Sequence, residues 1–240
     1  MSVMFKETAI LIFTFLIFSS CDFTNASEYY NRAIDLEKQE KHKEAILSLD
    51  RAIVKEPKFR PALLNRGNYK TEIGDFQGAI DDFNLLLVFD QDNTAALFNI
   101  GNSFSLLKEH KQSIDYYSKA LNTKGALRTI PISNRGYLDM ITNSDFKNFD
   151  SDMTYQMYDC LIYFERGMEY LYAKKYDKAI SDITKSLKAN NAEKDCYFLL
   201  GKAYLGKKDS INACQNFIES AQLGDQEARD MLKKYCIKKN

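Results

Sequence analysis

The 240-residue sequence contains no tryptophan, only three prolines and ten glycines, and two histidines. So little proline and glycine argues against flexible linkers and against the dense turns of an all-β sandwich. Charge of one sign is also missing, because 33 basic residues balance 33 acidic ones. A nucleic-acid-binding protein needs a basic surface to neutralise phosphates, so this balance argues against that class. Hydrophobic residues make up 45% of the chain, which excludes a disordered protein and favours a mostly helical fold.

The apolar run near the N-terminus is short. Residues 9–18 are apolar except for Thr14, and as a helix they would cover about 15 Å, half of the ~30 Å hydrocarbon core of a membrane. A run of this length matches the apolar region of a signal peptide. Phe18-Ser19-Ser20-Cys21 follows directly and resembles the lipoprotein box of bacteria, in which a cysteine after small residues is lipidated and becomes the new N-terminus. Phe18 departs from the aliphatic residue usual in that box.

This resemblance divides the N-terminal region into a lipoprotein signal peptide, residues 1–20, and a lipidated N-terminus with a tether, residues 21–25. It implies a lipid-anchored protein of the bacterial cell envelope that faces the periplasm or the cell surface, with the outer membrane favoured over the inner one. The alternatives are an ordinary cleaved signal in which Cys21 is coincidental, or an N-terminal membrane anchor.

A small residue recurs along the chain at intervals close to 34 residues. The positions are Ala33, Gly67, Gly101, Gly136, Gly167 and Gly201. Twelve residues after five of these positions stands a second small residue, and four residues later a bulky one. These residues are Ala45, Ala79, Ser113, Ala179 and Ala213, followed by Leu49, Phe83, Tyr117, Ile183 and Phe217. Two antiparallel helices approach closely only where both carry small side chains, and the bulky residue fills the space beside the contact.

This pattern resembles the tetratricopeptide repeat, a helical hairpin of 34 residues with small, aromatic and alanine positions in a fixed order. In the first repeat those positions hold Ala33, Leu36, Ala45, Leu49, Ala52 and Pro57, and later repeats place Phe104, Tyr170 and Tyr204 at the aromatic position. Lys70 at that position and Leu86 at an alanine position are departures in the second repeat. The resemblance implies an all-α, right-handed solenoid of about six hairpins, one of them degenerate, with a capping helix at its C-terminal end.

The repeats also set the expected domain organisation. Repeats one to three cover residues 26–127, repeats five and six cover residues 160–224, and the capping helix covers residues 225–240, with Asp225 as a candidate N-cap. Residues 128–159 between the two blocks keep Asn134 and Gly136 but lack the small residue that the second helix needs. They are interpreted as a degenerate repeat with a short or irregular second helix, or as an insertion between the two blocks.

No sequence motif points to catalysis. A phosphate-binding loop, a GxSxG elbow and paired CxxC motifs are all missing from the sequence. His42 and His110 occupy the same repeat position, in the turn between the two helices of a hairpin, which predicts solvated turn residues. We expect a protein that is not an enzyme, with no cofactor, no metal site and no small-molecule substrate.

The four cysteines beyond Cys21 lie in a chain that the signal would send to an oxidising compartment, where thiols pair. Cys214 lies about ten residues before Gly224 and Cys236 about twelve after it, so an antiparallel helical hairpin would bring them to a similar height. Cys214–Cys236 is therefore a candidate disulfide. Cys160 and Cys196, near the starts of neighbouring first helices, are a weaker candidate pair. The alternative is that all four are buried small hydrophobic residues.

The first helix of each repeat supplies the inner surface of a tetratricopeptide solenoid. In that family, asparagines there often hold the backbone of a bound peptide, because an amide offers both a donor and an acceptor. The predicted peptide groove comprises the asparagines Asn31, Asn65, Asn68, Asn99, Asn102 and Asn134, and the aromatic residues Tyr30, Phe98, Phe164 and Phe198. The alternative is that these residues are repeat consensus, kept for folding and for contacts between repeats.

The sequence thus predicts a membrane-anchored scaffold for protein–protein interaction in the bacterial cell envelope. Its partner would be another protein or a peptide segment, it would contact the membrane through its N-terminal lipid, and it would bind no nucleic acid. Two alternatives stay open: an accessory or regulatory subunit of an envelope enzyme or transport complex, and a structural envelope protein that self-associates.

Overall fold

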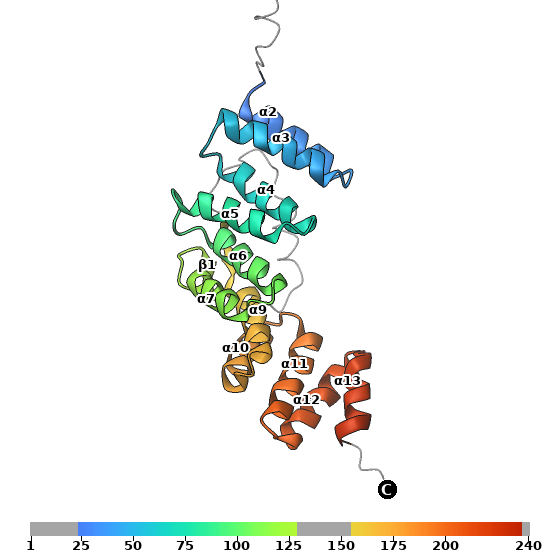
Figure 1. Cartoon of the computed structure of the whole chain (residues 1–240). Helices are drawn as coiled ribbons and strands as arrows, with labels where there is room; N and C mark the ends of the chain where they lie inside the picture. Colours follow the sequence, from blue (N-terminus) through green and yellow to red (C-terminus); the bar gives the residue numbers. More distant parts are fainter. Residues whose placement is uncertain (1–23, 129–154, 237–240) are drawn as a thin grey trace, which may run out of the picture. The chain divides into compact units, whose positions relative to one another are not determined.

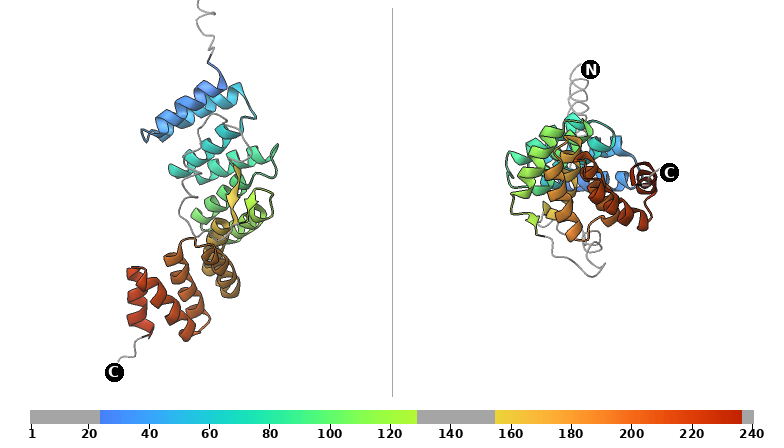
Figure 2. Two further views of the ribbon diagram at one scale, coloured as in Figure 1. Left: turned by 180° about the vertical axis from the view of Figure 1, so that it is seen from behind. Right: turned by 90° about the horizontal axis from the view of Figure 1, so that it is seen from below.

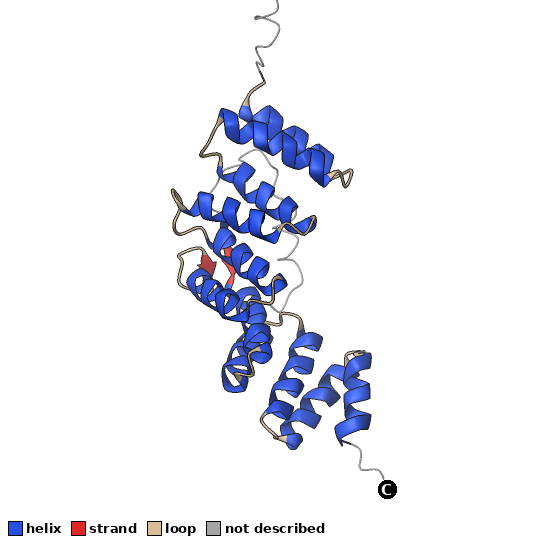
Figure 3. Cartoon of the chain, viewed as in Figure 1, coloured by secondary structure: helices blue, strands red, loops and turns tan. Residues whose placement is uncertain are grey.

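The computed structural model describes residues 24–128 and 155–236, and nearly all of them lie in short helices joined by tight turns (Figures 1 and 3). The chain divides into two compact units, Met1–Phe59 and Arg60–Asn240. The described part of the first unit is one helical hairpin, and that of the second contains four further hairpins and a final short helix. The prediction of an all-α fold built from helical hairpins is confirmed.

The first unit consists of α2 (Ala26–Glu37) and α3 (His42–Lys55). Asn25 starts α2 as its N-cap, because its side-chain oxygen accepts a hydrogen bond from the backbone N–H of Glu28 at 2.9 Å. The small Ala33, Ala45 and Ala52 are fully buried, which lets the two helices lie close together. Leu49 fills the space beside them and is also fully buried.

The second unit repeats this design. Its hairpins are α4 (Arg60–Glu72) with α5 (Phe76–Leu87), α6 (Thr94–Leu106) with α7 (His110–Leu121), α9 (Asp159–Tyr172) with α10 (Tyr176–Lys188), and α11 (Glu193–Gly206) with α12 (Ser210–Gln222). The last helix is α13 (Gln226–Met231), followed by a π-helical turn over Leu232–Cys236. In this unit each second helix packs on its own first helix and on the first helix of the next hairpin, except that α12 packs on the final helix α13.

The predicted small-to-bulky contact lies at the centre of each hairpin. A Cβ atom added at Gly67 would lie 2.4 Å from a ring carbon of Phe83, and one added at Gly101 would lie 2.6 Å from the ring of Tyr117. Gly201 meets Phe217 in the same way, at 2.5 Å. The glycine therefore makes room for the ring directly opposite it, so the bulky residue lies over the contact as well as beside it.

The turns inside the hairpins share one backbone device. The seventh residue after each small residue has a positive φ: Glu40, Gly74, Lys108, Lys174 and Lys208. A left-handed residue at the end of the first helix turns the chain and allows the last carbonyl groups to be bonded. After α6, for example, the backbone N–H of Glu109 donates to the carbonyl of Phe104 at 2.8 Å.

Two two-residue strands, which the sequence did not predict, lie between the blocks of repeats. β1 (Ala126–Leu127) pairs in parallel with β2 (Met157–Tyr158), so the chain before residue 129 lies beside the chain after residue 154 (Figure 2). α9 then packs against α7 as α6 packs against α5, with Ile162 of α9 buried beside Tyr117 of α7. The hairpins on either side of residues 129–154 therefore pack directly on one another. Residues 129–154, Asn134 included, lie outside the described residues.

The C-terminal helix begins as predicted. The Asp225 side chain accepts hydrogen bonds from the backbone N–H groups of Glu227 and Ala228 at 2.8 and 3.2 Å, which makes it the N-cap of α13. Ala228 is fully buried against Phe217 of the last hairpin, so α13 covers apolar surface that the hairpin would expose. Within residues 24–128 and 155–236, no helix is long and apolar enough to cross a membrane.

Candidate functional site

The predicted asparagines of the second unit form a row across neighbouring first helices. We call Asn65 and Asn68 of α4 and Asn99 and Asn102 of α6 the asparagine row. Its members are half-buried, and the Asn99 amide nitrogen donates to the Asn68 side-chain oxygen at 2.8 Å. This hydrogen bond joins two successive hairpins. Asn31, in the first unit, is exposed on α2.

Part of the hydrogen-bonding capacity of the row is unused. The Asn102 side-chain oxygen accepts a hydrogen bond from the Tyr117 hydroxyl at 2.6 Å. Within the described chain, the amide N–H groups of Asn68 and the side-chain oxygen of Asn99 have no hydrogen-bond partner. A donor and an acceptor on adjacent asparagines match the two polar groups of a peptide unit.

The four aromatic residues predicted as apolar pockets pack inside the hairpins. Tyr30 is only 5% exposed and packs on Phe59 with ring centroids 5.4 Å apart, so its proposed role as an exposed pocket residue is wrong. Phe98 packs on Tyr117 at 5.5 Å and Phe198 on Phe217 at 6.0 Å. Phe164 packs against the core of α9–α11. These three side chains are partly exposed and bury one face in their own repeats.

Glu165 of α9 continues the register of the row, a role that the sequence analysis missed. It lies two residues before Gly167, as Asn65 lies two before Gly67 and Asn99 two before Gly101. Counting back from the repeat glycine would have found it. Glu165 is half-buried, and its removal from water, together with the nearby carboxylate of Glu169, raises its pKa to about 7.

Glu169, one turn further along α9, joins two hairpins. It is 1% exposed, and its two oxygens accept hydrogen bonds from Ser105 at 2.7 Å and pair with His110 Nδ1 at 2.7 Å. His110 also stacks on Tyr172 with centroids 5.3 Å apart. The prediction of a solvated turn residue is therefore wrong for His110, since it begins α7 in contact with the next hairpin.

His42 has an equivalent position at the start of α3. Its Nδ1 lies 2.8 Å from Glu37 Oε2, and its side chain is 29% exposed. Here the glutamate belongs to α2 of the same hairpin, so this contact closes one hairpin whereas His110 joins two. Sequence spacing could not show either contact, because each depends on which carboxylate folding brings to the histidine.

Two buried arginine–aspartate pairs also escaped the sequence analysis. Asp82 of α5 is bound by Arg66 of α4 and by Lys70, whose Nζ lies 2.8 Å from its Oδ2. Asp182 of α10 is bound by Arg166 of α9 at 2.7 Å. In both hairpins the arginine directly precedes the repeat glycine and the aspartate follows it by 15 residues. That spacing was the available signal.

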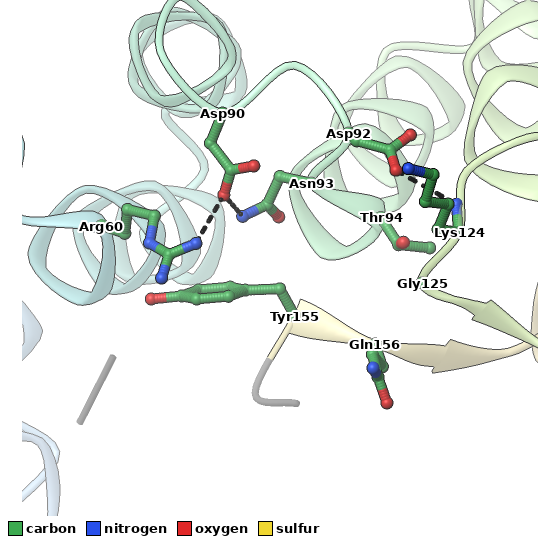
Figure 4. Close-up of a pocket in the computed structure, with 9 residues that line it drawn as sticks. All are labelled: Arg60, Asp90, Asp92, Asn93, Thr94, Lys124, Gly125, Tyr155 and Gln156. Carbon is green, nitrogen blue, oxygen red and sulfur yellow. Dashed lines mark hydrogen bonds and ion pairs between the residues drawn. The ribbon is translucent and has the colours of Figure 1, made fainter. Parts of the chain in front are cut away.

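A cavity of about 300 Å³ lies in the second unit, beside the turns that lead into α6 and β1 (Figure 4). On one side, Arg60 lies over the Tyr155 ring at 4.7 Å and pairs with Asp90 at 3.1 Å. On the other side, the Asp92 carboxylate accepts a hydrogen bond from the backbone N–H of Lys124 at 3.2 Å. Two basic and two acidic residues line this cavity, so it has no net preference for an anion or a cation.

The structure contains the predicted disulfide between Cys214 of α12 and Cys236, with Cα atoms 5.7 Å apart. It links the last hairpin to the segment after α13. Cys160 and Cys196 are buried thiols, and Cys196 donates to the carbonyl of Asn191 at 3.2 Å. Burial raises the pKa of Cys196 to about 12, which suits a packing role. In the part of the chain that the structure describes, no group of three histidine, cysteine or acidic side chains could hold a metal ion.

Solved structures share this fold at low sequence identity. MamA from Desulfovibrio magneticus RS-1 matches with a TM-score of 0.64 and 17% identity, over 84% of this chain and 97% of that chain. YrrB, described as a TPR protein with an unusual peptide-binding site, matches with a TM-score of 0.64 and 17% identity over 87% and 92%. PilF of Pseudomonas aeruginosa matches with a TM-score of 0.61 and 15% identity over 88% of each chain.

The family comparison agrees with these structures. A search of the curated proteins found no relative of this sequence. Two family models, both described as tetratricopeptide repeat, match residues 30–94 and residues 94–126 and 162–193. Together these matches cover more than half of the chain and coincide with hairpins that the structure contains. The chain belongs to the tetratricopeptide repeat family.

Proposed function

We propose that this protein is a non-catalytic scaffold that binds a segment of another protein along the asparagine row. The observation that carries the proposal is the Asn99–Asn68 hydrogen bond, which aligns amide groups from two successive hairpins and leaves a donor and an acceptor for a peptide backbone. The description of YrrB as a TPR protein with a peptide-binding site supports this use of the fold.

We further propose that the scaffold is attached to a bacterial envelope membrane through lipids on Cys21. The support is the sequence Phe18-Ser19-Ser20-Cys21 after a short apolar run. The disulfide in the structure fits the same compartment, because disulfides persist in oxidising environments outside the cytosol. One acyl chain gives marginal membrane binding, whereas the several chains of a lipoprotein hold it firmly.

The binding proposal is tested with a displayed library of random twelve-residue peptides, selected on the wild-type protein. The double variant Asn65→Ala, Asn99→Ala should bind the selected peptides at least tenfold more weakly, since each lost hydrogen bond that leaves a buried partner costs about 1–3 kcal/mol. Alanine is the better helix former, which offsets part of the cost of losing the Asn99–Asn68 hydrogen bond, so the melting temperature should fall only slightly. Asn84→Ala is the matched control, because Asn84 is an exposed asparagine on the second helix α5.

The same experiment can refute the proposal. If the selected peptides bind the double variant as tightly as the wild type, and charge reversals on the second helices abolish binding, the working surface lies elsewhere. The asparagines would then be repeat consensus.

A further inference from the structure

One carboxylate interrupts the neutral asparagine row. In α4 and α6 the position two residues before the repeat glycine is asparagine, and in α9 it is Glu165. The Asn99 amide donates to Asn68 of the preceding hairpin, which lies one residue after the repeat glycine of that hairpin. In α6, the hairpin before Glu165, the residue at the same position as Asn68 is Asn102. Glu165 is therefore the next member of the row in sequence register, with an acidic group in place of an amide.

Three charged side chains of α9 and α11 have partners other than Glu165. Glu169 on the same helix bonds Ser105 and His110 through its two oxygens. Arg166, the adjacent residue, is directed to Asp182. Lys202 of α11 lies over the Phe198 ring at 5.3 Å. Within the described residues, Glu165 itself has no hydrogen-bond or ion-pair partner.

Among residues 24–128 and 155–236, the elements packed against Glu165 give it no positive charge. From α9 it faces Glu169, and from α7 it faces the buried Tyr117, whose pKa is raised by burial and by Glu165. His110 is held on Glu169. The pairing energy between a carboxylate and an added cation is larger when the carboxylate is half-buried than when it is exposed, because less water screens the two charges. Glu165 is half-buried and has no counter-charge among the described residues.

We propose that the bound segment carries a lysine or arginine whose side chain pairs with Glu165 while its backbone lies on the asparagine row. This inference rests on the proposed function and specifies the chemistry of the partner. Neutral asparagines bind backbone of any sequence, whereas the single acidic position selects one basic side chain at a fixed register. An arginine would bind with two parallel hydrogen bonds and a lysine as a point charge.

The test uses the same random-peptide library, selected at pH 8 on the wild type and on Glu165→Gln. The wild type should enrich lysine or arginine at one register position, and the variant should not. In a selected peptide, replacing that lysine by norleucine should weaken binding to the wild type about tenfold and binding to Glu165→Gln less than twofold. Lowering the pH from 8 to 5.5 should weaken wild-type binding and leave the variant unchanged, because Glu165 becomes protonated.

The outcomes separate the two proposals. Peptides that lose affinity for the Asn65→Ala, Asn99→Ala variant but show no basic enrichment would overturn the role of Glu165 and leave the scaffold function standing. Peptides that bind the asparagine variant normally would overturn both. A basic preference that persists in Glu165→Gln would assign the recognition to another acidic residue and so also refute the inference.

Discussion

Replacing Glu165 by glutamine should make the protein more stable at neutral and alkaline pH, and by an amount that changes with pH. The folded protein raises the pKa of Glu165 from 4.5 to about 7 because burial disfavours its charged form. Since the pKa is higher in the folded state than in the unfolded one, the folded state holds a proton between these two values that the unfolded state has lost. Stability therefore falls as pH rises through this window.

The magnitude follows from the two pKa values. A change from 4.5 to about 7 corresponds to up to about 3 kcal/mol between the protonation states. The free energy of unfolding of Glu165→Gln, minus that of the wild type, should rise by this amount between pH 4.5 and pH 8. Urea denaturation of both proteins at several pH values measures it. Glu72→Gln, at an exposed position at the end of α4, is the control.

A difference between wild type and Glu165→Gln that stays constant from pH 4.5 to pH 8 would refute this reasoning. It would show that Glu165 is as well solvated in the folded protein as in the unfolded chain. A wild type that becomes relatively more stable as pH rises would show that a positive group already pairs with Glu165.

Four further changes have defined outcomes. Gly67→Ala should lower the free energy of unfolding by about 1–2 kcal/mol, because the added Cβ would lie 2.4 Å from the Phe83 ring. Adding Phe83→Leu should restore the stability, since the first hairpin already combines Ala33 with Leu49. A urea midpoint of Gly67→Ala equal to that of the wild type would contradict the contact. Lys108→Gly should raise the free energy of unfolding, measured by urea denaturation, by about 0.5–1 kcal/mol, because Lys108 has φ 62°. No gain would mean that the turn carries no strain. Replacing Cys214 and Cys236 by alanine should lower the free energy of unfolding by about 3 kcal/mol, as expected for a bridge across 22 residues. Intact-mass analysis should show that the two wild-type cysteines are protected from alkylation until the protein is reduced. Cys21→Ser should abolish lipid labelling and detergent partition, and unchanged partition would contradict the lipid anchor.

The periodicity of the sequence predicted the hairpins because it records a local steric requirement. A glycine in the first helix and a ring in the second occur at a fixed spacing since each repeat must solve the same packing problem, as Gly101 and Tyr117 do. The helix cap at Asp225 was predictable for the same reason, because its partners are two and three residues away. Such short-range features can be derived without knowing the fold.

The errors concern residues whose partners lie in another hairpin or beyond the repeat consensus. His110 was expected in solvent because its turn is exposed in a single hairpin, but the stacking of α9 on α7 brings Glu169 to it. Tyr30 was assigned to a pocket by register, whereas Phe59, after the end of its own hairpin, covers it. The pairing of β1 with β2 joins residues on either side of the segment 129–154. No local pattern contains these contacts.

The measurement that tests the central claim most directly is a nuclear magnetic resonance titration of the protein with a selected peptide, following the side-chain amide signals of its asparagines. If the asparagine row binds peptide backbone, the signals of Asn65, Asn68, Asn99 and Asn102 should shift with the binding curve. The signals of Asn84 and Asn212, exposed on second helices, should stay in place. Shifts confined to the second-helix asparagines, with the row unaffected at saturation, would contradict the account.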